Sequence, residues 1–291
     1  MIKFFRLAWL SFCAAVCFSV PVAWGQTVLH TEPSQFSPVV VYENLGERCM
    51  TFGSVQALGR QTCFAIEDPK KMVFNYTRMM MASLFVQPDP KRVLIIGLGG
   101  GTLPMALGEL LPNAKIDSVE LDPAVVNVAS RFFGYKVSDR QTVSLMDGRA
   151  YVEQAVREGR KYDLVMLDAF DITYIPQHLM TREFLQQIKK LLSPNGLLAA
   201  NTFSSSDLYR QESATYSDVF GRYFNLRANN RVIFAVNGRL PEAPTVRARA
   251  ETWRAAFQPY DIDIDTTLSL FTVQSDPADP ALVLTDSAMK K

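Results

Sequence analysis

The sequence VLIIGLGGGT, residues 93–102, indicates the fold class, because it joins an apolar strand to a glycine-rich turn. Residues 93–96 are continuously apolar, as strands of a parallel sheet are when helices cover both faces. A stripe of leucine and alanine follows over residues 103–111, with Pro104 in its first turn, and predicts an amphipathic helix. We therefore expect this stretch to open a doubly wound α/β unit.

The glycine-rich turn is the first candidate binding element. Gly97, Gly99, Gly100 and Gly101 let the backbone approach a ligand and turn sharply into the helix, although such turns also serve packing alone. A dinucleotide loop of the GxGxxG type would carry a third glycine where this chain has Thr102, and the chain has no GKS or GKT sequence. The turn therefore disfavours a dinucleotide and excludes a P-loop nucleotide triphosphatase.

Strands and helices alternate after this turn, which predicts a parallel sheet. The expected strands are residues 116–121, 143–146, 163–167 and 197–203, and the expected helices start at Asp122-Pro123 and span residues 150–158, 181–192 and 207–220. The sequence SPNG, residues 193–196, predicts a turn, and residues 226–234 predict two strands around Asn229-Asn230.

Counting residues 93–96 as the first strand, carboxylates mark the carboxyl ends of the second strand, residues 116–121, and of the third, residues 143–146. Glu120 lies at the end of the second strand, where an acid can accept hydrogen bonds from both hydroxyls of a ribose. Asp147, followed by Gly148, ends the third strand and is placed to accept from the exocyclic amine of adenine. Each acid by itself is also compatible with a solvated strand end. Together with the glycine turn they predict an adenosine site, and an adenosyl sulfonium ligand fits better than a dinucleotide.

The end of the fourth strand carries Asp168 and Asp171. A carboxylate across from a sulfonium can hold a cationic amine and accept its proton as the amine attacks carbon. The alternative is that Asp168 caps a turn and Asp171 is solvated. Tyr174 and His178 follow in the next loop, and each either lines the pocket or packs against its neighbours.

Two further regions flank the alternating segment. Upstream, residues 38–67 hold short β-branched and aromatic runs that predict a small antiparallel sheet, and residues 71–85 predict a helix whose three successive methionines fill the core. Downstream, a short helix is expected near residues 251–257, before a polar tail without a motif. The expected organisation is a signal peptide at 1–25, a β domain with its connecting helix at 26–88, a Rossmann-like domain at 89–239 and a C-terminal extension at 240–291.

The first 25 residues differ from the rest of the chain. They carry Lys3 and Arg6 but no acid, then an apolar run and small residues, which is the layout of a secretory signal cleaved after Gly25. The alternative is an uncleaved segment that anchors the protein in a membrane. In both cases we expect the body to be exported, to a periplasm if the source is a bacterium, or secreted.

The composition of the body is that of an ordinary globular protein. Without Lys3 and Arg6 the 30 Lys+Arg fall to 28, against 29 Asp+Glu, so the formal net charge changes from +1 to −1. With 48% hydrophobic and 20% charged residues, this balance argues against a nucleic-acid binder and against a disordered chain. No later stretch reaches about 18 uninterrupted apolar residues, which excludes a polytopic membrane protein.

The exported body keeps two cysteines, Cys49 and Cys63. In an oxidising compartment they are candidates for a disulfide, with two buried free thiols as the alternative. The cysteine pair by itself is too small a ligand set for zinc, and with only His30 and His178 available a histidine-based site is not expected either. We therefore expect no metal.

Five segments of the chain resemble one known family. They are VLIIGLGGG, VELDP, MDGRAYV, YDLVMLDAFD and IPQHLMTREF, in the order and at the spacing of the spermidine synthase (polyamine aminopropyltransferase) family, and the resemblance covers residues 37–238. It implies an α/β fold in which a small antiparallel β domain precedes a class I methyltransferase-like Rossmann domain. It also implies transfer of an aminopropyl group from decarboxylated S-adenosylmethionine to a small-molecule amine such as putrescine, with release of methylthioadenosine. Members of the family commonly dimerise.

The resemblance also implies roles for individual residues. By position, Glu120 would hold the ribose, and Asp147 with Gly148 the adenine. Asp168 would bind the amine and act as base, and Asp171 would be a second acid lining the entrance. The further candidates for substrate binding are Tyr76, Tyr174 and His178.

The chain departs from the family pattern at two places that bear on the reaction. The glycine loop of the family carries an aspartate that this chain lacks, and the family's acidic DE…YHE segment is replaced here by one containing Lys70, Lys71 and Arg78. Basic residues facing the pocket would disfavour a dicationic substrate. Two alternatives therefore stay open beside aminopropyl transfer: methyl transfer from S-adenosylmethionine, and an exported protein that binds an adenosyl ligand without catalysis.

Overall fold

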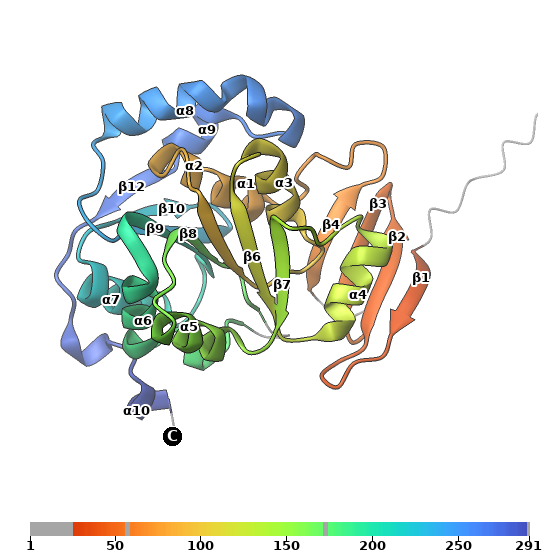
Figure 1. The fold of residues 1–291 in the computed structure, drawn as a ribbon, viewed down its shortest axis with the longest axis horizontal. Coiled ribbons are helices and arrows are strands. Elements are labelled where there is room, and N and C mark those ends of the chain that lie inside the picture. The colour runs from red at the N-terminus through yellow and green to blue at the C-terminus, as the bar shows by residue number, and fades with distance from the viewer. Residues whose placement is uncertain (1–25, 56–58, 171–173, 290–291) are drawn as a thin grey trace, which may run out of the picture.

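The protein folds around two β-sheets (Figure 1). The computed structural model describes residues 26–55, 59–170 and 174–289, so the expected signal peptide and Asp171 lie outside the described residues. The N-terminal sheet is antiparallel and has the order β1-β2-β3-β4, and its strands are Thr27–Glu32, Val39–Asn44, Glu47–Phe52 and Arg60–Ala65. The first strand precedes the region that the sequence marked as a sheet.

The large sheet has eight strands in the order β12-β10-β11-β9-β8-β5-β6-β7. Its strands are β5 Arg92–Ile96, β6 Lys115–Glu120, β7 Gln141–Leu145, β8 Tyr162–Leu167, β9 Leu192–Phe203, β10 Tyr223–Arg227, β11 Asn230–Val236 and β12 Phe271–Gln274. The five strands from β7 to β9 are parallel, and the other three are antiparallel. The order reverses between β5 and β8, and ligands of open α/β sheets bind outside the carboxyl ends of the strands at such a point.

Helices bury both faces of this sheet. Successive residues of β5 alternate between the two resulting cores, because side chains of a strand point to opposite faces: Ile95 belongs to one core and Leu94 and Ile96 to the other. The first face is covered by α1 Asn75–Met81, α2 Ser83–Val86, α3 Thr102–Leu110, α8 Ala243–Phe257 and α9 Ile264–Ser269. The second is covered by α5 Gly148–Arg157, α6 Arg182–Leu191 and α7 Tyr209–Phe220.

Helix α4, Pro123–Phe132, joins the two sheets. Asp122 caps its start by accepting from the Ala124 amide at 2.9 Å, as the Asp-Pro sequence predicted. Val125 and Val128 on this helix share a core with Val39 and Val41 of β2. The N-terminal sheet is thereby packed against the same end of the molecule at which β6 stops.

The predicted helix at residues 71–85 is wrong in extent. The structure has two helices, α1 and α2, separated at Ala82, and residues before Asn75 are not helical because Met72 bridges to Phe64 of the N-terminal sheet. The three methionines, Met79, Met80 and Met81, are fully buried in the core, as predicted.

Two other predictions need correction. The turn predicted at residues 193–196 is an irregularity inside β9, where Asn195 has φ 60°. These residues stay in the sheet because the Asn195 amide donates to the carbonyl of Asn237 and the Asn237 amide donates to the carbonyl of Gly196. The helix expected near residues 251–257 is the last part of the longer α8. Beyond it, β12 adds a strand to the edge of the large sheet, which the polar tail did not suggest. Among the described residues, no helix has both the length and the apolar character needed to cross a bilayer.

Candidate active site

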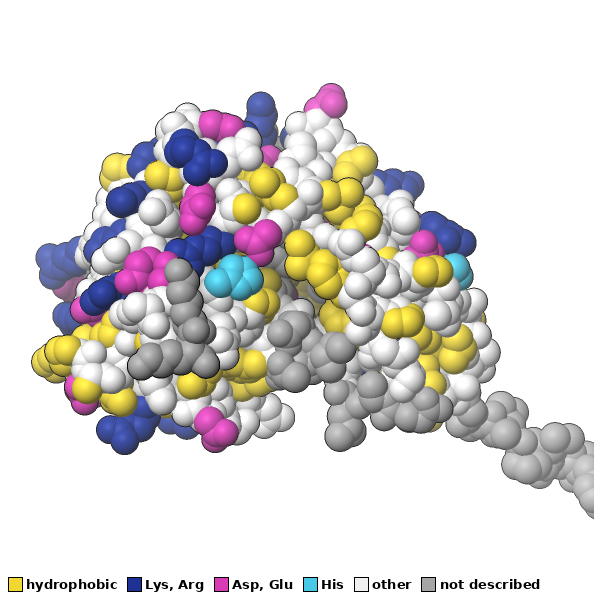
Figure 2. Space-filling model, turned by 90° about the horizontal axis from the view of Figure 1, so that it is seen from below, with side chains coloured by type: hydrophobic (Ala, Val, Ile, Leu, Met, Phe, Trp, Pro, Cys, Tyr) yellow, Lys and Arg dark blue, Asp and Glu magenta, His cyan; other side chains and the backbone are white. Residues whose placement is uncertain are grey.

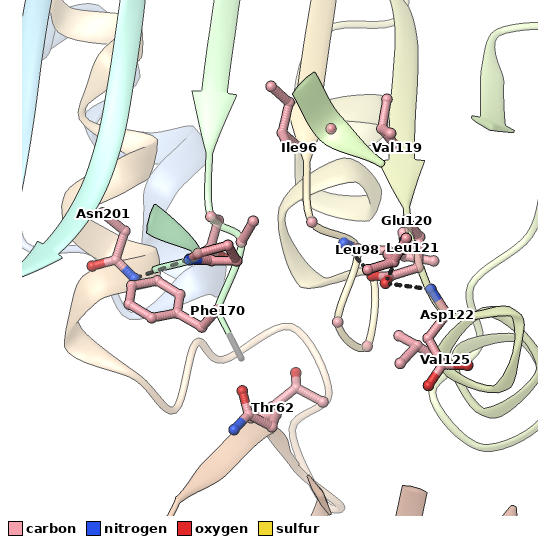
Figure 3. A pocket seen from close by; sticks show the side chains of 18 of the residues that line it. Thr62, Ile96, Leu98, Val119, Glu120, Leu121, Asp122, Val125, Phe170 and Asn201 are labelled. Atoms are coloured by element: carbon pink, nitrogen blue, oxygen red, sulfur yellow. Dashed lines mark hydrogen bonds between the residues drawn. The ribbon is translucent and has the colours of Figure 1, made fainter. Parts of the chain in front are cut away.

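A cavity of about 760 Å³ lies where the carboxyl ends of the parallel strands face the N-terminal sheet. Its walls come from the ends of β5, β6, β7, β8 and β9, from α1 and from β4. Hydrophobic side chains gather in the middle of the face shown in Figure 2. Figure 3 shows Thr62 projecting from the N-terminal sheet toward the strand ends that carry Glu120 and Asn201. The cavity has the size of a small-molecule site.

The glycine turn brings three parts of the molecule together. Gly97 has φ 96°, and a Cβ there would lie 2.2 Å from the carbonyl oxygen of Asp168. A Cβ at Gly100 would lie 2.7 Å from the Thr62 side chain. Only glycine permits such close approach of β8 and of the N-terminal sheet to one turn. Gly97, Gly99 and Gly100 line the cavity and Gly101, at φ 82°, packs on Tyr135, so the turn serves both packing and the cavity wall.

Glu120 lies at the end of β6 with its carboxylate inside the cavity wall. Oε1 accepts from the Leu121 and Asp122 amides at 2.8 and 3.0 Å, and Oε2 accepts from the Leu98 amide at 3.0 Å. Burial raises the pKa of the carboxyl, and these amide hydrogen bonds oppose that shift. The backbone therefore fixes the orientation of Glu120, and Oε2 keeps acceptor capacity toward the cavity, where a sugar hydroxyl would donate.

Asp147 lies two residues after the end of β7 and caps α5 by accepting from the Ala150 amide at 3.0 Å. Its other oxygen, Oδ2, lies 2.8 Å from Nε2 of His178, which comes from the 3-10 turn Gln177–Leu179. Although burial opposes ionisation, the hydrogen bonds from Ala150 and His178 lower the pKa of Asp147. Gly148 packs on Ile96, where a Cβ would lie 2.6 Å from Cγ2. Asp147, Gly148 and His178 all line the cavity, so the structure brings these three predicted residues together.

Asp168, at the end of β8, is held by side chains rather than by backbone amides. Nδ2 of Asn201 donates to Oδ1 at 2.9 Å, and the Tyr76 hydroxyl donates a second hydrogen bond. Burial raises the pKa of Asp168 to about 6, and both hydrogen bonds act against that rise. Burial and the nearby Asp168 carboxylate raise the pKa of the Tyr76 hydroxyl well above its ordinary value, so Tyr76 is a donor. A carboxylate with this pKa, facing a cavity, suits the acceptance of a proton near neutral pH.

Tyr174 is placed differently from the other predicted residues. It is not among the residues that line the cavity; its hydroxyl donates to Oε1 of Glu212, and its ring packs on Phe203 and Phe170 with centroid distances of 5.3 and 6.1 Å. Phe170 and Phe203 themselves line the cavity. Tyr174 therefore supports the wall from behind.

The basic residues of the divergent segment turn away from the cavity. Lys70 pairs with Glu109, and Lys71 and Arg78 both pair with Asp261. None of the three lines the cavity. The objection that they raise against a cationic substrate therefore does not apply.

Several functional candidates have no signal in the sequence. Asn201 of β9 is buried and holds Asp168, and Asn230 of β11 donates to Oδ1 of Asn201 at 3.3 Å. Phe170, Phe203 and Thr62 also line the cavity. Asn201 and Phe203 lie two residues apart near the end of a predicted strand, but the sequence does not show that this strand is the neighbour of β8.

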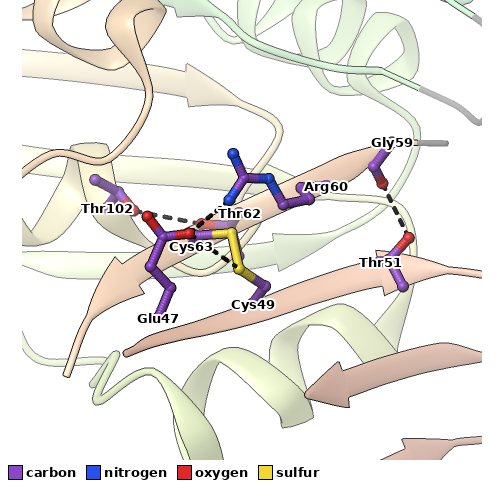
Figure 4. Close-up of a disulfide and its surroundings, with 8 residues drawn as sticks. All are labelled: Glu47, Cys49, Thr51, Gly59, Arg60, Thr62, Cys63 and Thr102. Carbon is purple, nitrogen blue, oxygen red and sulfur yellow. Dashed lines mark hydrogen bonds and ion pairs between the residues drawn. A yellow bond between two sulfur atoms is a disulfide. The ribbon is translucent and has the colours of Figure 1, made fainter. Parts of the chain in front are cut away.

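A disulfide braces the strand that closes the cavity (Figure 4). Cys49 and Cys63 face each other across β3 and β4 and form the predicted bond, with Cα atoms 4.1 Å apart. Residues 59–62, directly before Cys63, line the cavity. Glu47 lies beside the two sulfur atoms, but both sulfurs belong to the disulfide.

Comparison with known proteins shows the family of the chain. The model of the family "Spermine/spermidine synthase domain" matches residues 73–235, more than half of the chain. The chain belongs to the spermine/spermidine synthase family. This confirms the resemblance drawn from the five segments, and it makes the protein a member of a transferase family.

One relative agrees with this membership, and two solved structures show the fold. The chain is 44% identical over 273 residues to a polyamine aminopropyltransferase of Vibrio vulnificus, and the match covers 91% of each chain. A spermidine synthase in complex with the transition-state analogue AdoDATO has a similar fold, with a TM-score of 0.60 at 24% identity over 73% of this chain and 74% of that chain. Human methyltransferase-like protein 13 in complex with SAH superposes with a TM-score of 0.57 at 26% identity, over 74% of this chain and 99% of that chain. The predicted fold, a methyltransferase-like Rossmann fold after a small antiparallel sheet, is confirmed.

Proposed function

We propose that the protein is a polyamine aminopropyltransferase, which moves an aminopropyl group from decarboxylated S-adenosylmethionine to an amine and releases methylthioadenosine. One observation carries the proposal. The Asp168 carboxylate, with a pKa of about 6, faces the cavity from β8, and Glu120 faces the same cavity from β6, with β5 and the glycine turn between them. A carboxylate that can accept a proton and a carboxylate that can accept hydrogen bonds from a ribose thereby lie on the two sides of one turn.

The co-substrate would occupy the β5–β7 side of the cavity. Glu120 would accept from the ribose hydroxyls, Asp147 is the candidate for the adenine amine, and the glycine turn gives the room for the sulfonium. Because His178 and Ala150 already use acceptor sites of Asp147, the adenine contact requires a remaining lone pair of that carboxylate.

The acceptor amine would occupy the β8–β9 side. Its nitrogen forms a bond to the aminopropyl carbon as the bond from that carbon to sulfur breaks, and the proton released by the nitrogen passes to Asp168. Asn201 and Tyr76 hold the carboxylate so that it does not rotate away from the amine. The rings of Phe170 and Phe203 would cover the methylenes of the amine and attract its cationic end.

We further propose that the protein is exported. What supports this is the signal-like sequence of residues 1–25 and the Cys49–Cys63 bond, since disulfides persist in oxidising compartments. Fractionation of cells that make the full chain, with mass analysis of the recovered protein, tests it. A start at Gln26 in the periplasmic or secreted fraction is expected; full-length protein in the cytosol would contradict export.

The test of the activity is product release from two co-substrates. Purified protein is given decarboxylated S-adenosylmethionine or S-adenosylmethionine, each with putrescine and a panel of other amines. We expect methylthioadenosine from the decarboxylated compound only. S-adenosylhomocysteine from the ordinary compound would indicate methyl transfer instead, and ligand binding without either product would indicate a non-catalytic protein.

A further inference from the structure

A buried polar group lies behind the aromatic wall of the cavity and takes no part in the proposed chemistry. Glu212 of α7 and Arg231 of β11 are both buried, with 2% and 0% of their surfaces exposed. Nη1 of Arg231 lies 3.7 Å from Oε2 of Glu212, an oxygen that has no hydrogen-bond partner among the described residues. Oε1 of Glu212 accepts from the Tyr174 hydroxyl.

The fold holds this group in place from several elements. Arg231 donates to Asn225, to Ser213 and Tyr223, and to the carbonyl of Tyr209, whose ring lies 4.0 Å from its guanidinium. A carboxylate and a guanidinium removed from water cost free energy that their attraction repays only in part, and an apolar group of the same size often serves stability equally well. The position of Glu212 therefore calls for a reason other than stability.

Tyr174 connects this group to the cavity. Its ring packs on both cavity-lining rings, Phe203 and Phe170, which in turn stack on each other with centroids 5.2 Å apart. Its hydroxyl also accepts from the Phe203 amide at 3.4 Å. The hydroxyl thus links the buried carboxylate of α7 to the backbone at the end of β9.

The wall so held is next to the reacting group. Asn201, which donates to Asp168, and Phe203 are two residues apart on β9 and so point to the same side of the strand. A shift of Phe203 would alter the space available to an amine beside Asp168. It would leave the Glu120 side of the cavity untouched, because the contacts of Glu120 are to the backbone of residues 98, 121 and 122.

We propose that Tyr174, fixed by Glu212, is a positioning residue for the acceptor amine: it sets the place of Phe203 and Phe170 and thereby the fit of the amine beside Asp168. The inference rests on the proposed aminopropyl transfer. It assigns Tyr174 a role in acceptor binding through two other residues, without contact to the substrate.

The test compares Tyr174→Phe with a matched control, Tyr151→Phe. Tyr151 is also buried and shares a 2.9 Å hydrogen bond with the hydroxyl of Tyr162, but it lies on α5 and does not line the cavity. With decarboxylated S-adenosylmethionine and putrescine, we expect Tyr174→Phe to raise the KM for putrescine at least fivefold, with kcat and the Kd for methylthioadenosine changed less than twofold. Tyr151→Phe should leave all three within twofold.

Glu212→Gln keeps an oxygen that accepts from Tyr174, so the variant, where circular dichroism shows it to be folded, should stay within twofold of wild type in KM. It also removes the charge beside Arg231 and should lower the free energy of unfolding. An unchanged KM in folded Tyr174→Phe would overturn the proposal, and so would a KM for Glu212→Gln as high as that of Tyr174→Phe. A loss of methylthioadenosine affinity equal to the rise in KM would also overturn it, because the effect would then be general.

A second measurement separates this inference from the activity itself. Hydrogen–deuterium exchange of the peptide that contains Phe203 is compared in wild type and Tyr174→Phe, both with methylthioadenosine. Faster exchange in the variant is expected even if wild type turns over no amine, in which case the proposed function fails and the positioning contact stands. Equal exchange rates would contradict the positioning contact whatever the activity.

Discussion

The two sides of the cavity hold their carboxylates by different means. On the β6 side, backbone amides fix the Glu120 carboxylate: one comes from Leu98 in the glycine turn and two come from Leu121 and Asp122. On the β8 side, Asp168 depends on two side chains, Tyr76 from α1 and Asn201 from β9. The first arrangement comes with the local backbone and is rigid, as binding a ribose requires. The second is assembled from distant parts of the chain and leaves a carboxylate whose proton affinity is raised.

The substitution with the strongest expected consequence changes the carboxylate on the β8 side alone. Asp168→Asn keeps the size of the side chain but removes its charge and basicity, so turnover should fall by about 10²–10⁴-fold. Because burial raises the pKa of Asp168 to about 6, the native state binds more protons than the unfolded state between about pH 4 and 6, and the ionised carboxylate lowers stability above that range. The variant should therefore be more stable at pH 7, by on the order of 1–3 kcal/mol.

Rates of methylthioadenosine release and urea unfolding at pH 7 measure the two effects of this substitution. Methylthioadenosine affinity serves as the control and should stay unchanged. Full activity in Asp168→Asn would remove the proposed base.

The next prediction concerns the disulfide that holds β4, the strand of the N-terminal sheet that lines the cavity. Replacing Cys49 and Cys63 with serine removes a crosslink between residues 14 apart, which is worth about 3 kcal/mol in the chain-entropy model. The free energy of unfolding should fall by that amount, and non-reducing mass spectrometry of the wild type should show the bond. Since Glu120 is held by its own backbone, methylthioadenosine binding by the folded variant should change little. A large loss of that binding would show that the adenosine side also depends on the N-terminal sheet.

The third prediction breaks the β6 side. Glu120→Gln replaces one accepting oxygen with an amide group that cannot accept from the neighbouring N–H groups, and it removes the charge offered to the ribose. Charge-assisted hydrogen bonds contribute about 1.5–3 kcal/mol each, so methylthioadenosine should bind at least about tenfold more weakly to a folded variant. Titration calorimetry, with circular dichroism to establish folding, checks this. Unchanged affinity would mean that the ribose binds elsewhere.

The smallest effect is a difference in pH dependence between kcat and the affinity for methylthioadenosine. Proton acceptance requires ionised Asp168, so kcat should fall by about tenfold for each pH unit below about 6 and level off above it, as far as this group is concerned. The Kd of methylthioadenosine should not follow the same curve. Rates and affinities measured from pH 5 to 8 test the difference. A break near pH 6 that persists in Asp168→Asn would assign it to another group.

The same contrast between local and long-range contacts explains which parts of the site could be predicted from the sequence. Glu120, Asp147 and Asp168 could be placed because each lies at or within two residues of the end of a strand, and because strand ends of a parallel sheet share one edge. The Asp122 cap and the facing cysteines are also local signals. Asn201, Tyr76 and Glu212 could not be given partners, because their contacts depend on which elements pack together. The break at Ala82 and the place of β12 depend on tertiary packing in the same way.

The position of β12 has a consequence for the order in which the chain can complete its fold. This strand pairs with β10 and covers an edge that otherwise presents unpaired amides and carbonyls next to Phe224 and Leu226. Its residues lie near the end of the sequence, after α8 and α9. During synthesis, the outer edge of β10 therefore stays unpaired until residues 271–274 have emerged. A protein shortened before Phe271 would keep that edge permanently and would be expected to associate with other copies through it.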